Sequence, residues 1–158
     1  MIQSVCIVYK VQRSVHMRKI KLKAMAKINL GLDVVRKRED GYHEVRMIMQ
    51  TIRMYDQLQL LKREAPGIRV KTNLYYLPTN EDNLVYKAAK LLMDEFHIRQ
   101  GLHIDLHKFI PVAAGMAGGS SDAAAVLVGM NRMFGLGLSR TQLMEREVKL
   151  GADIPYCI

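Results

Sequence analysis

The first half of the chain alternates between apolar and polar residues with a period of two, which is the pattern of half-buried β-strands. Turn-forming residues separate several of the alternating segments, and short turns between successive strands indicate antiparallel pairing. We therefore expect a largely antiparallel sheet. The segments for which the sequence predicts strands are 19–25, 28–35, 44–52, 57–63 and 68–72.

From Asn83 onward the spacing of apolar residues changes to three and four, which predicts an amphipathic helix over 83–97. Strict alternation returns at 101–107 and predicts another strand. Strands followed by helices in this order favour an α+β fold, with a mainly antiparallel sheet and helices packed on it.

Two further helices are predicted in the last third of the chain. The first covers 120–134, where two serines can serve as N-caps, the next aspartate lies in the first turn, and a long apolar stretch indicates burial. The second starts near Ser139, because Ser139 and Gln142 have the spacing of a capping box, and runs to about Leu150.

Length and termini indicate one domain. The chain has 158 residues, enough for one domain with a real core. Met17 directly precedes the first strand pattern, so we expect residues 1–16 to be an N-terminal extension and residues 17–158 to be the folded domain. The apolar segment among the opening residues is too short for a membrane span or a secretory signal, so no membrane partner is expected.

The charge and the cysteines narrow the function only slightly. A net charge of +9 and an isoelectric point near 9.7 suit an anionic partner such as a nucleotide, a phosphorylated metabolite, nucleic acid or a membrane surface. The basic residues are spread along the chain, so a solvated surface is the commoner explanation of the charge. Cys6 and Cys157 stand at opposite ends without the spacing of a metal site or a disulfide framework, which favours a reducing cytoplasm.

The strongest chemical signal is the stretch PVAAGMAGGSSDAAA at 111–125. A glycine-rich turn between a strand and a helix N-terminus is an anion site, because backbone N–H groups and the helix dipole converge there. The glycines let the backbone approach phosphate oxygens, and the two serine hydroxyls can donate to a phosphate or ligate its magnesium. The alternative is a tight turn whose serines only cap the helix. The ending of a Walker A motif is missing.

The same stretch resembles the Pro-x-x-x-Gly-(Leu/Met)-(Gly/Ala)-(Gly/Ser)-Ser-Ser motif of the GHMP kinases. Two more segments, AKINLGLDVVRKREDGYHEV at 26–45 and GADIPYCI at 151–158, are similar to motifs of one family within them, the 4-diphosphocytidyl-2-C-methyl-D-erythritol kinases of non-mevalonate isoprenoid synthesis. The resemblance covers about 18–158. It implies the GHMP N-terminal domain with its ribosomal-protein-like fold, ATP and Mg²⁺ as cofactors, and a small cytidine-diphosphate-linked polyol as substrate. It implies neither nucleic acid nor a membrane as partner.

The resemblance also implies roles for individual residues. Lys27 and Asp153 match the family's catalytic pair, with Asp153 as the base that accepts the proton of the attacking hydroxyl. Asn29 lies two residues after Lys27 on a strand and would orient the substrate. Tyr42 and His43 match the pair that receives the cytosine. The positions that match the family's ATP site are Asn83, Lys108, Pro111, Gly115, Gly118, Gly119, Ser120 and Ser121.

Several of these residues also have plain structural interpretations. Asn83 can be a helix N-cap, and Tyr42 with His43 can close a turn at the sheet edge. His103, Asp105 and His107 alternate on one strand and could ligate a metal, but they are more simply its solvent-facing side, so we expect no metal site there.

Family members continue into a second domain after the aspartate motif, so we expect this chain to lack that C-terminal domain, to self-associate and to show impaired turnover. Another GHMP kinase of the homoserine or mevalonate type is an alternative, although DGYHE argues against it. A basic RNA-binding module is a second alternative.

Overall fold

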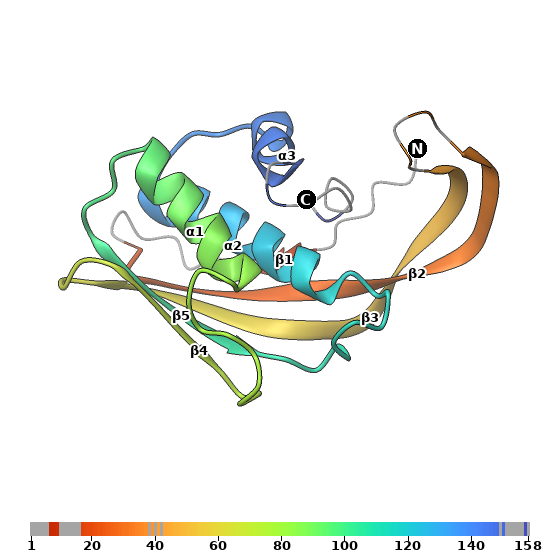
Figure 1. The fold of residues 1–158 in the computed structure, drawn as a ribbon. Coiled ribbons are helices and arrows are strands. Elements are labelled where there is room, and N and C mark those ends of the chain that lie inside the picture. Colours follow the sequence, from red (N-terminus) through yellow and green to blue (C-terminus); the bar gives the residue numbers. More distant parts are fainter. Residues whose placement is uncertain are drawn as a thin grey trace.

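The computed structural model describes residues 7–9, 17–37, 39, 41, 43–148, 150 and 157. In these residues five strands form one sheet in the order β1-β2-β3-β5-β4, and the helices lie over one of its faces (Figure 1). Only the β4–β5 pairing is parallel, so the predicted α+β fold with a mainly antiparallel sheet is confirmed. The elements are β1 Ile7–Tyr9, β2 Lys19–Lys37, β3 His43–Arg63, β4 Ile68–Thr72, α1 Leu84–Glu95, β5 Gly101–His107, α2 Gly118–Phe134 and α3 Arg140–Val148.

Four of the predicted strands join in pairs to form two long strands. Segments 19–25 and 28–35 join into β2, and segments 44–52 and 57–63 join into β3. The two long strands pair along nearly their whole length, with register shifts at Met25/Lys27, Asn29/Gly31 and Val34/Arg36. An inserted residue interrupts the period of two and bends the strand without ending it. The β2–β3 hairpin therefore curls upward at its far end, beyond the helices (Figure 1).

Part of the expected N-terminal extension belongs to the sheet. Ile7–Tyr9 forms β1 and pairs with residues 22–24 of β2 in antiparallel register. A strand of three residues is too short to show alternation, so its period could not be recognised from sequence.

Two of the three helices begin as their caps predict. Asn83 caps α1, and its side-chain oxygen accepts a hydrogen bond from the backbone N–H of Val85 at 3.0 Å. Before α3, the Ser139 N–H donates to Oε1 of Gln142 at 2.9 Å and the Gln142 N–H donates to Oγ of Ser139 at 3.2 Å. The predicted capping box is confirmed, and the helix ends at Val148 rather than near Leu150.

The start of α2 differs from the prediction. The helix begins at Gly118, two residues earlier than expected, and its N-cap is Ala117 with a left-handed backbone and no side-chain hydrogen bond. The serines are therefore inside the first turn and do not cap it. Residues 123–127 of α2 are completely buried against the sheet and α1.

The core lies between the sheet and the helices. Alternate residues of β2, β3 and β5 point into the core. Beyond Lys27, the side chains of β2 become exposed. Full burial of each leucine or isoleucine side chain contributes about 1.5–3 kcal/mol. The fully buried large side chains are Leu58, Leu60, Val85, Leu92, Leu102, Ile104, Leu106, Ile110, Leu127 and Met130.

Gly101, the first residue of β5, lies very close to the backbone of Ala65. A Cβ atom at Gly101 would lie 1.9 Å from the carbonyl oxygen of Ala65, which belongs to backbone and cannot rotate away. We expect Gly101→Ala to lower the free energy of unfolding by about 1–3 kcal/mol, as overpacking does. Gly31→Ala is the matched control, because a Cβ there meets nothing within 4 Å in another strand of the same sheet. Urea unfolding measures both, and an equal effect of the two changes would contradict the close approach.

Candidate active site

The glycine-rich segment after β5 encloses a pocket of about 460 Å³. The loop supplies one wall, β2 contributes Lys27, and the segment before α1 contributes an opposite wall that includes Leu77, Pro78 and Asn83. Leu106 and Lys108 form its floor at the end of β5. Three elements that are distant in sequence thus meet around one cavity.

The backbone of the loop alternates in handedness. Ala113, Gly115 and Ala117 have φ values of +60°, +71° and +57°, whereas the residues between them have no positive φ. Alternation of this kind turns successive N–H groups toward one side, which forms an anion-binding concavity. Two alanines in the left-handed region each cost about 1–2 kcal/mol, so the surrounding structure holds the loop in this shape.

The loop ends at the N-terminus of α2, where the first N–H groups of a helix have no partner within the helix. Gly118 lies directly on the floor, since a Cβ there would be 3.0 Å from Cγ2 of Ile110 and 3.1 Å from Nζ of Lys108. The N-cap residue of this helix, Ala117, makes no side-chain hydrogen bond to it. The positive end of the helix dipole therefore faces the pocket with its N–H groups available to an anion.

Hydrogen bonds to the loop and to α2 hold Lys27 at the pocket edge. Its backbone N–H donates to the carbonyl oxygen of Met116 at 3.1 Å, and Oγ of Ser121 donates to the carbonyl oxygen of Met25 at 2.7 Å. Nζ of Lys27 donates to Oδ1 of Asn29 at 3.2 Å. The predicted placement of Lys27 and Asn29 on the same side of β2 is confirmed.

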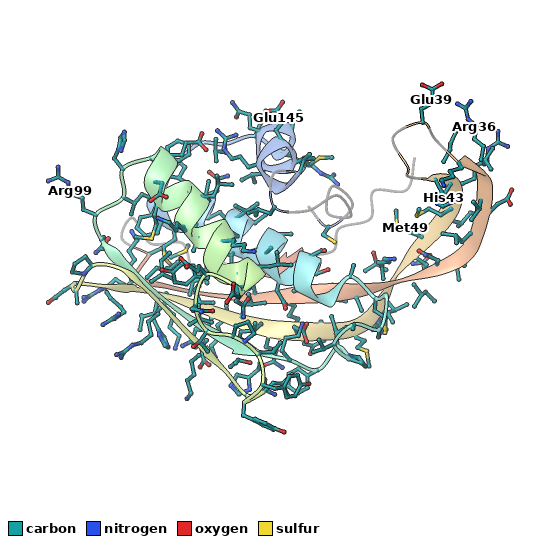
Figure 2. All side chains as sticks on the ribbon, in the orientation of Figure 1. Arg36, Glu39, His43, Met49, Arg99 and Glu145 are labelled. Atoms are coloured by element: carbon teal, nitrogen blue, oxygen red, sulfur yellow. The ribbon has the colours of Figure 1, made fainter. Side chains whose placement is uncertain are left out.

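The face that carries Lys27 continues along the curled hairpin. From His43 to Thr51, β3 pairs without an inserted residue of its own, so its alternate residues share one face with their partners on β2. By this register His43 lies on the same face as Lys27 and Asn29. Figure 2 shows His43 near the curled end of the hairpin. The pairs on this face are Lys27–Thr51, Asn29–Met49, Leu32–Met47, Val34–Val45 and Lys37–His43.

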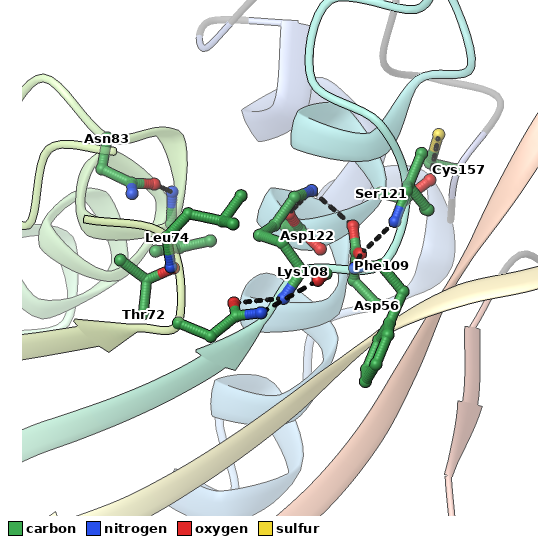
Figure 3. A network of polar contacts seen from close by, with 12 residues as sticks. Asp56, Thr72, Leu74, Asn83, Lys108, Phe109, Ser121, Asp122 and Cys157 are labelled. Atoms are coloured by element: carbon green, nitrogen blue, oxygen red, sulfur yellow. Dashed lines mark hydrogen bonds and ion pairs between the residues drawn. The ribbon is translucent and has the colours of Figure 1, made fainter. Parts of the chain in front are cut away.

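Beneath the loop lies a buried cluster of three charged residues, Asp56 of β3, Lys108 and Asp122 of α2 (Figure 3). Nζ of Lys108 is bonded to Oδ2 of Asp56, and to Oδ2 of Asp122 at 2.7 Å. Oδ1 of Asp122 is buried without a hydrogen-bond partner among the described residues. One ammonium group is therefore shared by two carboxylates.

The cluster shifts the protonation of two of its members. Burial lowers the pKa of Lys108, but Asp122 and Asp56 outweigh it and the pKa is raised overall. Burial raises the pKa of Asp122 well above its ordinary value, because Lys108 offsets only part of the desolvation and Asp56 adds a like charge. Desolvation disfavours a charged carboxylate, so Asp122 holds a proton more readily than an exposed aspartate.

Most of the expected ATP-site residues line the pocket, namely Asn83, Lys108, Pro111, Gly115, Gly118, Gly119 and Ser120. Ser121 does not, because it is fully buried and its hydroxyl is bonded to Met25. Its expected contact with phosphate is therefore corrected to a contact between helix and strand. Asn83 holds α1 and also lines the pocket. Tyr42 and Asp153, for which the sequence predicted roles, fall outside the described residues.

Sequence reasoning missed Asp56 as a member of the site. It stands two residues before Leu58 and four before Leu60, both of which point into the core. A carboxylate at an inward position of a period-two pattern was the available signal. Asp122 was assigned to a first helical turn, whereas the structure places it in the ion cluster.

Two other expectations concern absent features. His103, Asp105 and His107 lie on the more exposed face of β5, with Nε2 of His107 3.8 Å from Oδ1 of Asp105. Within the described ranges, no three or more histidine, cysteine or acidic side chains are grouped so as to hold a metal ion. In that same part of the chain no helix has the length and apolarity needed to cross a bilayer.

The raised pKa of Asp122 predicts a dependence of stability on pH. The unfolded carboxyl titrates near 3.8, and the folded one keeps its proton to higher pH. This contribution to stability is complete below about pH 3.8 and is lost as the pH rises through the folded pKa, with a slope of up to about 1.4 kcal/mol per pH unit. We expect Asp122→Asn to gain stability relative to wild type as pH rises from 4 to 8 in urea titrations. A constant difference across that range would contradict it.

Comparison with known proteins agrees with this geometry. Residues 83–158 match the family model described as GHMP kinases N terminal domain. Two relatives named 4-diphosphocytidyl-2-C-methyl-D-erythritol kinase come from Lachnospira eligens, 56% identical over 90% of this chain and 49% of the relative, and Lachnoclostridium phytofermentans, 60% identical over 88% and 48%. The chain thus spans about half the length of the curated relatives that it matches.

A solved structure supports the same assignment. The crystal structure of a 4-(cytidine 5'-diphospho)-2C-methyl-D-erythritol kinase superposes with a TM-score of 0.76 at 35% identity, covering 87% of this chain and 48% of that one. The similarity to that kinase covers 87% of the chain that contains the glycine loop, the start of α2 and the supporting sheet. The chain is therefore a relative of the GHMP kinases, and is similar over nearly nine-tenths of its length to the 4-diphosphocytidyl-2-C-methyl-D-erythritol kinases among them.

Proposed function

We propose that this chain provides the nucleotide-binding part of an ATP-dependent kinase that phosphorylates a hydroxyl group of 4-diphosphocytidyl-2-C-methyl-D-erythritol. Residues 17–158 form its N-terminal domain in this proposal, and β1 adds an edge strand to it. The observation that carries the proposal is the loop of alternating handedness that leads into the N-terminus of α2, with Lys27 lining the same pocket.

The phosphates of ATP would bind in the concavity of the loop. Backbone N–H groups from the loop and from the first turn of α2 would donate to phosphate oxygens, together with the hydroxyl of Ser120. The adenosine would lie toward Leu77, Pro78 and Asn83, which form the apolar and amide wall of the pocket. Lys108 would support this site from below, since its ammonium group is bonded to two carboxylates.

The chemical step transfers the terminal phosphoryl group to the substrate. The hydroxyl oxygen forms a bond to the phosphorus, the bond from that phosphorus to the leaving ADP oxygen breaks, and the hydroxyl proton passes to a base. By resemblance that base is Asp153. The Lys27 ammonium, oriented by Asn29, would neutralise the charge that develops on the phosphoryl oxygens.

The cytidine end of the substrate would lie along the hairpin. His43 shares a ribbon face with Asn29, and the six residue steps from His43 to Met49 span about 20 Å of strand. This length suits a substrate with a nucleobase at one end and a reacting hydroxyl at the other. His43 would hydrogen-bond the base edge, and by resemblance Tyr42 would stack on its face.

A magnesium ion would accompany the nucleotide. Mg²⁺ in kinases is held largely by phosphate oxygens and by few protein oxygens, which fits a pocket whose loop offers a serine hydroxyl. We assign Ser120 to it, since this residue lines the pocket whereas the Ser121 hydroxyl is bonded to Met25. When bound, the ion supplies charge neutralisation on the phosphates.

Two alternatives remain distinguishable by experiment. Another GHMP kinase would bind ATP but would have no use for a cytidine site on the hairpin. An RNA-binding module is suggested by the net charge of +9, and its binding would weaken steeply with salt. Neither alternative accounts for both the glycine-loop pocket and the continuous face from Lys27 to His43.

The proposal is tested by the thermal midpoint of the purified chain, because a ligand that binds only the folded state raises it. We expect Mg-ATP and the cytidine-diphosphate-linked substrate each to raise the midpoint. His43→Ala should weaken binding of the cytidine substrate about tenfold, the equivalent of one hydrogen bond, without affecting ATP. Arg46→Ala is the matched control, since Arg46 lies on the opposite face of the same strand.

Different outcomes separate the alternatives. A rise with ATP alone, unaffected by either variant, would favour another GHMP kinase. Stabilisation by RNA at low salt without a response to either small molecule would overturn the kinase proposal.

A further inference from the structure

Asp56 is completely buried, and both of its carboxylate oxygens are bonded (Figure 3). Oδ1 accepts hydrogen bonds from the backbone N–H groups of Phe109 at 2.5 Å and Ile110 at 2.8 Å. Oδ2 is bonded to Nζ of Lys108. A single side chain on β3 therefore contacts three consecutive residues where the chain leaves β5.

These contacts replace a sheet ladder at the point where the ladder ends. β5 stops at His107, so the next N–H groups have no partner on a neighbouring strand. Asn73 bonds both the N–H and the carbonyl oxygen of Lys108, at 2.8 and 3.1 Å, and Asp56 bonds the two N–H groups that follow. The entry to the glycine loop is thus fixed by side chains.

The same carboxylate also reaches the other end of the loop through Lys108. Nζ of Lys108 is bonded to Asp122 of α2 and lies close beneath Gly118, where a Cβ would be 3.1 Å from it. Ile110 packs against the same residue, since its Cγ2 atom lies 3.0 Å from that Cβ position. Entry and exit of the loop are therefore both set relative to Asp56.

We propose that Asp56 is a positioning residue for the candidate phosphate loop, holding residues 108–110 and the first turn of α2 at the separation that a bound phosphate requires. The inference rests on the proposed function for its ligand. It assigns to Asp56 no contact with ATP, since this residue is fully buried and does not line the pocket.

Charge and position predict opposite effects when the carboxylate is removed. Taking one negative charge from beneath an anion site should strengthen phosphate binding if electrostatics alone mattered. Loss of the fixed loop geometry should weaken it, because a displacement of about 1 Å in a positioning group can cost on the order of 100-fold. The direction of the change therefore identifies the role.

The experiment compares Asp56→Asn with Asp122→Asn in the full chain. Both changes preserve side-chain size and replace one carboxyl group of the same cluster, but only Asp56 holds loop-entry N–H groups. The dissociation constant for sodium tripolyphosphate is measured by calorimetry at a temperature where each variant is folded. We expect Asp56→Asn to bind at least about tenfold more weakly than wild type, and more weakly than Asp122→Asn, which loses only the contact of Lys108 with α2.

Amide hydrogen exchange supplies a readout that needs no ligand. In Asp56→Asn we expect faster exchange across residues 109–119 and unchanged exchange in β4 and α3. Binding as tight as wild type, or faster exchange confined to residues 109–110, would overturn the proposal. If the wild-type chain fails to bind tripolyphosphate, the proposed function fails, and the exchange comparison still decides the role of Asp56.

A wild-type measurement covers the case in which Asp56→Asn does not fold. We expect the amides of Phe109 and Ile110 to exchange as slowly as those of Ile104 and Leu106 in the sheet. Exchange at the rate of an exposed loop would overturn the assignment.

Discussion

The close contact between α2 and β2 sets the geometry of the whole site. Small residues allow it, since a Cβ at Gly129 would lie 2.6 Å from Cδ1 of Leu60 and 3.0 Å from Cδ1 of Leu22. At this separation the Ser121 hydroxyl reaches the carbonyl oxygen of Met25, and the Lys27 N–H reaches the loop. A larger residue at the contact would move the helix N-terminus away from the strand that carries the cationic side chain.

The loop is costly by itself and depends on its surroundings. Ala113 and Ala117 occupy a backbone region that disfavours alanine, and the ion cluster beneath them requires desolvation of three charges. Such features persist only where packing and hydrogen bonds over-determine the conformation. Here the fully buried alanines of α2 and the leucines of the sheet provide that packing. Packing of the core therefore stabilises a loop conformation and an ion cluster that are each unfavourable by themselves.

Sequence patterns predicted the elements whose signals are local. The β5 strand followed from strict alternation, α1 followed from the helical spacing of its apolar residues, and α3 followed from the Ser139–Gln142 capping box. The glycine loop was recognised because three glycines and two serines are crowded ahead of a helix. The bulges that join the long strands were missed, since an inserted residue resembles the end of a strand when only periodicity is available.

The contacts that cross the chain could not be predicted in this way. Asp56 and Lys108 are 52 residues apart, and no local pattern pairs them. Ser121 illustrates the converse error, because its position in a phosphate motif suggested a ligand contact, whereas its burial inside the first turn of α2 turns the hydroxyl toward β2. Local sequence indicates which groups are available, and tertiary packing decides which of them face a ligand.

The curled end of the hairpin has a consequence for how the two ends of the site open. Between His43 and Thr51, β3 pairs only with β2 among the described residues, and side chains of this two-stranded ribbon such as Leu30 of β2 and Ile48 of β3 are 63% and 66% exposed. A two-stranded ribbon is marginally stable without a packed face, so this part can unfold locally while the loop stays folded with the core. When one ligand contacts both the loop and the ribbon, most of the entropy lost on binding would come from ordering the ribbon. The rate at which the ribbon opens would then set the residence time of the ligand.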